Sequence, residues 1–331
     1  MARSLLDDDR YKLQFAGHET FPLRYGWLKK SYDQIVRVST MQGGDTRSVF
    51  TDDAAIAYFG VGKNMVTSMR HWALSSGILE AQEADEGGRS SRIAPTGLGD
   101  LLLGPSGDPY LEHPASLWLV HWNLVATPER TTTWYWAFND LHEPSFDREL
   151  LRQRLMRRCE DLKKRGRLAR ITEVTIRRDV ECFIRTYASR PTVERGIQED
   201  NLECPLTELS LIQPLGVGGA FQFRRGPKPT LPDEVFLFAL IAFWMRLHEG
   251  RRSLSVEAIT HEPGSPGRAF LLDEDSVADR LARLSELTGG DVRWDESTGL
   301  RQVYARDPSA VDAPALLRSL YGLALPAARA A

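Results

Sequence analysis

Cysteine is scarce in this 331-residue sequence, and its three copies (Cys159, Cys182 and Cys204) form no Cys-x-x-Cys pair. This scarcity excludes a disulfide framework. No stretch approaches the roughly 18 consecutive apolar residues of a membrane span. Residues 1–10 are polar and acidic, so they do not form the apolar core of a signal peptide. We therefore expect a cytoplasmic protein that does not enter a membrane.

An overall excess of basic charge is also missing, because 42 Lys and Arg residues stand against 45 Asp and Glu residues, a net charge of −3. The balance is uneven along the chain, however. Residues 148–178 hold twelve basic side chains and four acidic ones. A phosphate backbone responds to such a local field, but an arginine-rich helix face in solvent fits the same pattern. Both interpretations stay open on this stretch alone.

Length and composition predict two or three globular domains. Apolar residues make up 42% and charged residues 26% of the chain, which are ordinary values for a protein with a buried core. The predicted fold class is mainly α with small β wings (α+β). We divide the chain into an N-terminal motif segment (1–34), a winged helix-turn-helix (35–105), a helical middle region with the basic stretch (106–250) and a C-terminal winged-helix-like domain (251–331).

The winged-helix prediction is clearest for residues 51–104. Thr51 caps an apolar helix over 54–59, and Gly60-Val61-Gly62 then supplies a three-residue turn. A second helix over 63–76 stops at Gly77. Two short strands around a Gly-rich loop follow, and a closing helix completes the unit.

The second helix of this unit carries the predicted DNA contacts. At 100° per residue its apolar positions fall on one side and most polar positions on the other. In DNA-binding winged helices such a helix enters the major groove, and arginines around it hold phosphates. A protein-binding winged helix is the alternative. The predicted DNA-binding residues are Lys63, Asn64, Thr67, Ser68, Arg70, His71, Arg89 and Arg92.

A similar order of elements returns near the C-terminus without a repeat at the residue level. We predict a short helix over 254–259, a turn over 263–268, a helix that Asp273–Ser276 cap and Gly289-Gly290 end, and a hairpin over 292–304. Acidic side chains on the longer helix argue against DNA binding there. This unit is expected to be structural or to form a homodimer.

The middle region is expected to be mainly helical. Its tryptophans cluster in two places, at Trp118 and Trp122 and at Trp134 and Trp136, and aromatic clusters of this kind are usually core. Stacking on a splayed base is the alternative. A basic, proline-containing loop over 224–229 has the composition to meet a phosphate.

Several short motifs carry a family resemblance that covers nearly the whole chain. They are Phe15-Ala-Gly-His-Glu-Thr-Phe-Pro-Leu-Arg24, Arg178–Tyr187, Glu199–Asn201 with Cys204–Leu206, Pro263–Arg268 and Leu300–Gln302. In these motifs the chain resembles a bacterial family of DNA-nicking components of single-stranded phosphorothioate (Ssp) modification and phage-defence systems.

The resemblance implies a strand-specific nick in double-stranded DNA, after which partner proteins replace a non-bridging phosphate oxygen with sulfur. The implied partners are a cysteine desulfurase, a sulfur transferase similar to phosphoadenosine-phosphosulfate (PAPS) reductase and an ATPase. The residues themselves add no nuclease signature. His-x-Lys and His-Asn-His patterns are absent, and no acid-x-Lys pair accompanies a second suitable acid on a predicted strand.

His18, Glu19 and Asp179 are the predicted catalytic residues. An imidazole beside a carboxylate can act as a base or a metal ligand near neutral pH. The alternative is structural: His18 and Glu19 tie down the N-terminal segment, and Asp179 pairs with Arg185. A metal cofactor, if used, is expected to be Mg²⁺ or Mn²⁺, for which Glu199, Asp200 and Glu203 offer oxygen ligands. A solvated acidic loop is the alternative for this cluster.

The sequence thus favours a DNA-binding, strand-specific nicking endonuclease. Two other functions stay open. One is a non-catalytic DNA-binding adaptor or transcriptional regulator that recruits sulfur-transfer enzymes, and the other is a scaffold whose winged helices bind only proteins.

Overall fold

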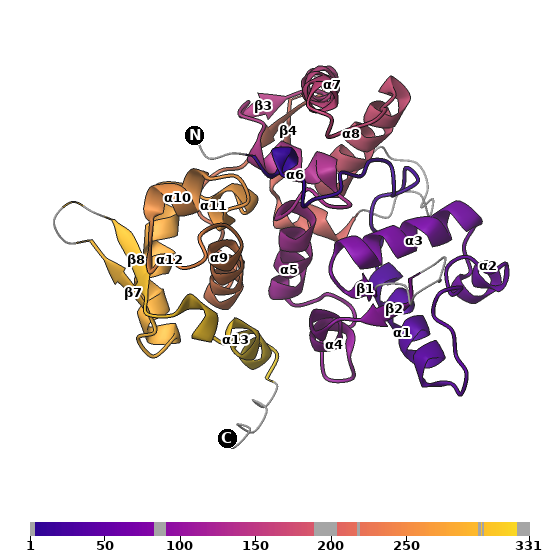
Figure 1. Ribbon diagram of the computed structural model, residues 1–331, viewed down its shortest axis with the longest axis horizontal. Coiled ribbons are helices and arrows are strands. Elements are labelled where there is room, and N and C mark those ends of the chain that lie inside the picture. Colours follow the sequence, from indigo (N-terminus) through magenta and orange to yellow (C-terminus); the bar gives the residue numbers. More distant parts are fainter. Residues whose placement is uncertain are drawn as a thin grey trace.

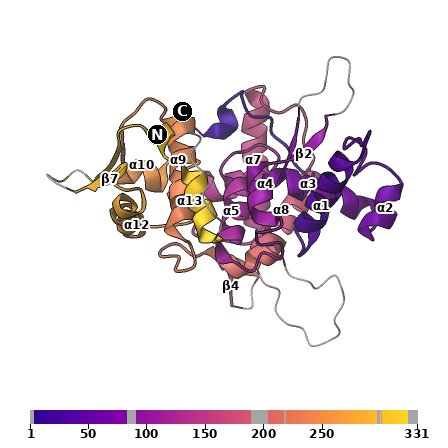
Figure 2. The same ribbon diagram turned by 90° about the horizontal axis from the view of Figure 1, so that it is seen from below.

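The computed structural model describes residues 4–82, 91–188, 204–216, 219–296, 299 and 301–322. The described residues form an α+β fold with many helices and three small antiparallel sheets, of which the sequence predicts the class and two of the sheets. In Figure 1 the violet N-terminal elements lie at one end, the middle helices at the centre and the orange and yellow C-terminal elements at the other end. Figure 2 shows the same order along the long axis.

The N-terminal unit consists of four helices and a two-stranded hairpin. They are α1 (Trp27–Thr40), α2 (Ala54–Phe59), α3 (Lys63–Ser75), β1 (Leu79–Ala81), β2 (Ile93–Pro95) and α4 (Gly97–Leu103). Helix α1 packs against α3, β2 and α4, so it runs across the predicted boundary between residues 34 and 35. Gly60 ends α2 in the left-handed conformation, and the Thr96 side chain caps α4. The helix boundaries match the predicted ones closely, whereas the winged-helix interpretation stays a prediction.

The middle region combines five helices with a sheet that the sequence did not predict. The helices are α5 (Pro114–Val125), α6 (Thr132–Asn139), α7 (Arg148–Lys164), α8 (Glu173–Tyr187) and α9 (Asp233–Leu247). Strands β3 (Ser145–Phe146), β4 (Ile212–Leu215) and β5 (Ala220–Phe223) form an antiparallel sheet in the order β3-β5-β4. Short 3-10 helices also occur along the chain, namely η1 (Leu5–Asp7) near its start, η3 (Pro205–Leu209) in the middle region and η5 (Pro308–Ala310) near its end.

The C-terminal unit places helices beside a three-stranded antiparallel sheet of order β6-β8-β7. Its elements are β6 (Ser253–Ser255), α10 (Val256–His261), α11 (Pro266–Ala269), α12 (Glu274–Leu287), β7 (Val292–Asp295), β8 (Gln302–Ala305) and α13 (Ala313–Leu320). The helix predicted over 254–259 begins later, because Leu254 and Ser255 pair with β8. The Ser255 hydroxyl then accepts from the Ala258 N–H and caps α10.

Helix α5 is the centre of the hydrophobic core. It is apolar around most of its circumference and packs against α6, α9, α11 and η3. Trp118 and Trp122 on this helix are at most 2% exposed, and Trp134 and Trp136 on α6 are at most 4% exposed. The prediction that these tryptophans form core is therefore confirmed.

The segment before α1 crosses from the middle of the molecule to the N-terminal unit. The Leu5 N–H donates to the Tyr135 hydroxyl at 3.1 Å. The Arg167 guanidinium donates to the carbonyl oxygens of Leu6, Asp8 and Tyr11. These contacts hold the start of the described chain against α6 and the end of α7.

None of the described helices combines the length and the apolar character that crossing a membrane requires.

Candidate nucleic-acid interface and N-terminal motif

The N-terminal motif, residues 15–24, follows an unusual backbone path between α8 and α3. Ala16, Glu19 and Thr20 have φ values of 59°, 47° and 71°, a left-handed region that residues other than glycine rarely adopt. Such a conformation persists only where surrounding contacts enforce it. The contacts that do so here come from His18 and Phe21.

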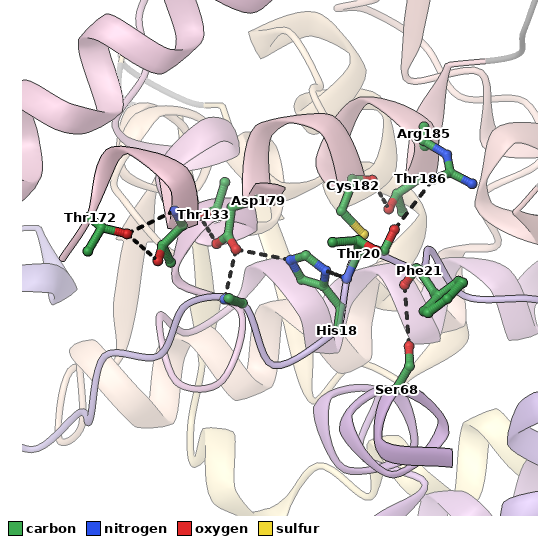
Figure 3. Close-up of polar contacts among 12 residues, drawn as sticks. His18, Thr20, Phe21, Ser68, Thr133, Thr172, Asp179, Cys182, Arg185 and Thr186 are labelled. Carbon is green, nitrogen blue, oxygen red and sulfur yellow. Dashed lines mark hydrogen bonds and ion pairs between the residues drawn. The ribbon is translucent and has the colours of Figure 1, made fainter. Parts of the chain in front are cut away.

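The His18 imidazole holds the turn from inside. Its Nδ1 accepts the Thr20 N–H at 3.1 Å, so Nδ1 carries no proton and Nε2 donates to Asp179 Oδ1 at 3.0 Å. Figure 3 shows His18 between Asp179 on α8 and the backbone of Thr20. Both side chains of the pair are 1% exposed. The ring also packs against Trp72 and Trp134.

Asp179 is a buried carboxylate with three hydrogen-bond donors. Besides His18, the Ala16 N–H donates to Oδ1 at 2.7 Å and the Thr133 hydroxyl donates to Oδ2 at 2.6 Å. These bonds offset the cost of burying the carboxylate. Thr133 was missed in the sequence, because nothing in a Thr-Thr-Thr run indicates which hydroxyl faces an acid on another helix.

The three predicted catalytic residues occupy different environments. Both ring nitrogens of His18 are engaged, and His18 and Asp179 are shielded from solvent, so in this conformation neither touches a substrate. The expected alternative pairing of Asp179 with Arg185 is wrong, since Asp179 bonds to His18, Ala16 and Thr133 instead. Glu19 is exposed, and its carboxylate has no hydrogen bond or ion pair with any described residue.

The motif also covers part of α3. The Phe21 carbonyl accepts from the Ser68 hydroxyl at 3.4 Å and from Trp72 Nε1 at 3.0 Å. Ser68 is therefore 0% exposed and His71 only 6%. The prediction that these two side chains lie on the exposed face of the helix is wrong, because the N-terminal motif, which is distant in sequence, packs over them. Figure 3 shows its contact between Phe21 and Ser68.

His71 packs edge-on against the rings of His18 and Trp72. Burial, followed by the nearby charges of Arg130 and Arg70, lowers the pKa of His71 to about 3, so its imidazole is neutral at physiological pH. Its Nε2 is buried without a hydrogen-bond partner among the described residues.

The N-terminal end of α3, which is also part of the predicted DNA-reading face, is exposed to solvent. Lys63, Asn64 and Thr67 are exposed and lie in the first turns of α3. Arg70 is half-buried, and burial together with the neighbouring Arg130 lowers its pKa. Neither arginine forms an ion pair within the described part of the chain. Arg130 was not predicted as part of this surface, since it lies in a loop sixty residues from Arg70 in sequence.

The hairpin arginines are only partly described. Arg92 is exposed next to β2, and its charge acts on Asp45, which already pairs with Arg47. Arg89 lies outside the described residues, as does the acidic cluster at 199–203. Within the described residues no group of three or more His, Cys, Asp and Glu side chains is placed to hold a metal ion.

Much of the basic stretch on α7 and α8 is neutralised by ion pairs. Arg148 pairs with Glu181, Arg152 with Glu149 and Glu173, Arg154 with Glu143, Arg158 with Asp7 and Asp140, Lys164 with Asp161, Arg165 with Asp7 and Arg167 with Asp9. The basic side chains that pair with no described acid are Arg157, Lys163, Arg170, Arg177 and Arg178, and all five are exposed. The local excess in the sequence thus leaves a smaller free charge on the surface.

The cysteines show no sign of sulfur chemistry. All three are buried and unpaired, as free cysteines of a core are. Burial raises the pKa of Cys159 and of Cys204 to about 12, and it raises that of Cys182 as well. None of them is therefore a thiolate nucleophile in this conformation.

Comparison with known proteins places these features in a wider group. Residues 15–321 match the model of a family described as Protein of unknown function (DUF4007). A magnesium ion-bound SspB crystal structure has a TM-score of 0.82 and 29% identity, over 97% of this chain and 91% of that chain. Another SspB crystal structure has a TM-score of 0.79 and 31% identity, over 93% and 88%. No match was found among the curated proteins.

Proposed function

Because this chain belongs to the DUF4007 family and resembles SspB over almost its whole length, we propose that it binds double-stranded DNA as the nicking component of an Ssp-type phosphorothioation system. In such a system the nick would precede sulfur transfer. The partners that the proposal names are a cysteine desulfurase, a PAPS-reductase-like sulfur transferase and an ATPase.

The observation that carries the DNA-binding part is the unpaired basic surface at the start of α3. Lys63, Asn64 and Thr67 are exposed there, and Arg70 with Arg130 adds positive charge that no described acid neutralises. Short polar side chains can reach base edges, and arginine can hold phosphates on either side. Ser68 and His71 are left out of this interface because they are buried.

For the nicking part we assign distinct roles to the three motif residues. Glu19 is the exposed carboxylate without a partner, so it is the group that can take a proton from an attacking water. His18 and Asp179 are positioning residues, because their buried hydrogen bonds fix the turn that presents Glu19. In this hydrolysis water adds to phosphorus, one P–O bond breaks, and the leaving oxygen takes up a proton.

One of the similar SspB structures is magnesium ion-bound. The described residues here do not form a three-ligand metal group, so no step of the proposed reaction is routed through Mg²⁺ or Mn²⁺. Magnesium binding by one carboxylate and substrate phosphates needs no such group, and the nicking assay below includes both metals.

A supercoiled-plasmid assay tests the proposal. Purified protein with Mg²⁺ or Mn²⁺ should convert supercoiled DNA to open circles, and Glu19→Gln should slow this by about 100-fold or more because the general base is lost. Glu112→Gln is the matched control, since Glu112 is another exposed glutamate, located just before α5. Equal rates for wild type and E19Q would refute the role of Glu19.

A second function is favoured by a specific observation: His18 and Asp179 are buried, and the described residues assemble no metal group around them. It is a non-catalytic DNA-binding adaptor or transcriptional regulator that recruits the sulfur-transfer enzymes. Absence of open circles with either metal, together with retained DNA binding, would establish this function over the nickase.

A further inference from the structure

A small cavity lies where α6, the β3-β5-β4 sheet and α11 meet, and no residue of α3 lines it. Its volume is about 260 Å³, below the 300–1,000 Å³ typical of sites for drug-sized ligands. The polar side chains that line it are His142, Glu143, Gln222, Arg225 and Arg268. The cavity therefore suits a small polar group and offers it several hydrogen-bond donors.

Arg268 is the deepest of these donors. It belongs to the Pro263–Arg268 motif and is 7% exposed. Its Nη2 donates to the carbonyl oxygens of Asn139 and Leu141, which fixes the guanidinium in place. Its Nε is buried without a hydrogen-bond partner among the described residues. A buried donor without a partner is costly, and a ligand at this site can relieve that cost.

Arg225 brings a second guanidinium to the same cavity. It belongs to the basic loop over 224–229, and its Nη1 donates to the Leu272 carbonyl at 3.2 Å. Burial, and then the charge of Arg225, lowers the pKa of Arg268 to about 10. Two like charges thus face one cavity and repel each other there.

The acids around this pair have other partners. Glu143 pairs with Arg154 at 2.6 Å, and Asp140 accepts from the Ser4 hydroxyl at 2.7 Å. Asp273 accepts the Ser276 N–H at 2.8 Å and caps α12. The charges of Asp140 and Asp273 act on Arg268 and Arg225, but none of these acids bonds to either guanidinium of the cavity, so guanidinium donors remain for an anion.

We propose that this cavity binds a phosphate group, held by the two arginine forks with His142 and Gln222 at its rim. Planar guanidinium groups bind tetrahedral oxyanions through paired, charge-assisted hydrogen bonds. The group belongs either to free phosphate or to the terminal phosphate of a nucleic-acid strand. The site is separate from the proposed DNA surface on α3 and does not depend on it.

Calorimetric titration with inorganic phosphate at constant ionic strength tests the site. Arg225→Gln should weaken phosphate binding about tenfold or more, because charge-assisted hydrogen bonds are lost. Gln222→Glu should have a similar effect, because the added carboxylate is negatively charged and repels phosphate. Arg224→Gln is the matched control: Arg224 is the adjacent exposed arginine, does not line the cavity and should keep wild-type affinity within about twofold.

A second binding experiment, with DNA in place of inorganic phosphate, identifies the source of the phosphate. The same short duplex is compared with and without a 5′-phosphate, in wild type and in R225Q. A preference for the phosphorylated end that R225Q abolishes assigns the site to strand termini, and no preference with retained phosphate binding assigns it to the free anion. Lys63→Gln should leave phosphate binding unchanged, which separates this site from the α3 surface.

The proposal is overturned if wild type binds no phosphate and shows no preference for the phosphorylated end. It is equally overturned if R225Q and R224Q weaken binding to the same extent, because the effect is then one of general surface charge.

Discussion

At the scale of single residues, Gly17 leaves no room for a side chain inside the N-terminal motif. A Cβ built there would lie 2.4 Å from His71 Nδ1 and 2.5 Å from Gln14 Nε2. His71 is buried and cannot swing away cheaply. Gly17→Ala should therefore destabilise the protein by about 1–3 kcal/mol, the usual cost of overpacking, and a lowered thermal unfolding midpoint would report it.

Gly97 provides the control for that substitution. It lies in the first turn of α4, is exposed and has no atom near a built Cβ. Gly97→Ala should stabilise slightly, by about 0.4–1 kcal/mol, because the unfolded chain loses freedom. If both variants changed the midpoint alike, close packing at Gly17 would not be the cause.

Residue-level prediction was limited by contacts distant in sequence. The helical pattern correctly placed Lys63, Asn64 and Thr67 on an exposed face of α3. The same pattern placed Ser68 and His71 there, yet the motif around Phe21 covers both. A helical period separates polar from apolar sides, but it contains no information on which polar side chains a remote segment will bury.

At the scale of elements, the start of α3 is the surface whose charge matters most for DNA. Lys63→Gln removes one exposed cation that pairs with no described acid. If Lys63 contacts a phosphate, the slope of log affinity against log salt should fall in magnitude by about 0.9. Fluorescence anisotropy of a labelled duplex across a salt series measures this slope.

Arg306→Gln is the control, because Arg306 is an exposed cation just after β8, and Figure 1 shows β8 and α3 at opposite ends of the molecule. It should leave the slope unchanged. An equal change in both variants would mean that net charge, and not the α3 surface, governs binding.

The sequence located α2, α3, α4 and α12, because caps and glycines mark their ends, whereas it gave no bounds for α1, α5, α6 or α7. Asp273 at the start of α12 and Gly60 at the end of α2 are examples. The β3-β5-β4 sheet was missed since β3 has only two residues and its partner β5 begins more than seventy residues later. Pairing of such short, distant strands leaves no local pattern.

At the scale of the whole molecule, buried neutral histidines make stability depend on pH. His121 is 0% exposed, and its ring bonds to the Tyr187 hydroxyl and the Ala269 carbonyl, each at 2.8 Å. Burial lowers the pKa of His121 to about 4 and that of His71 to about 3. The unfolded chain takes up these protons near pH 6.5, whereas the folded protein does not.

Stability should therefore be full above about pH 6.5 and fall as the pH drops toward 4, by about 2 kcal/mol for each histidine between pH 7 and 5. Thermal unfolding midpoints over this range measure the trend. His121→Gln should flatten it, and His142→Gln should not, because His142 is exposed. Unchanged midpoints between pH 7 and 5 would contradict the assignment.

The tie between His18 and Asp179 joins residues 161 positions apart, and this separation affects synthesis. A ribosome adding roughly 5–20 residues per second translates for about 10–30 s between these two residues. During that interval the nascent motif cannot close its turn, and the part of α3 that it later covers stays open to water and chaperones. The covered side of α3 can thus reach its mature form only after α8 has left the exit tunnel.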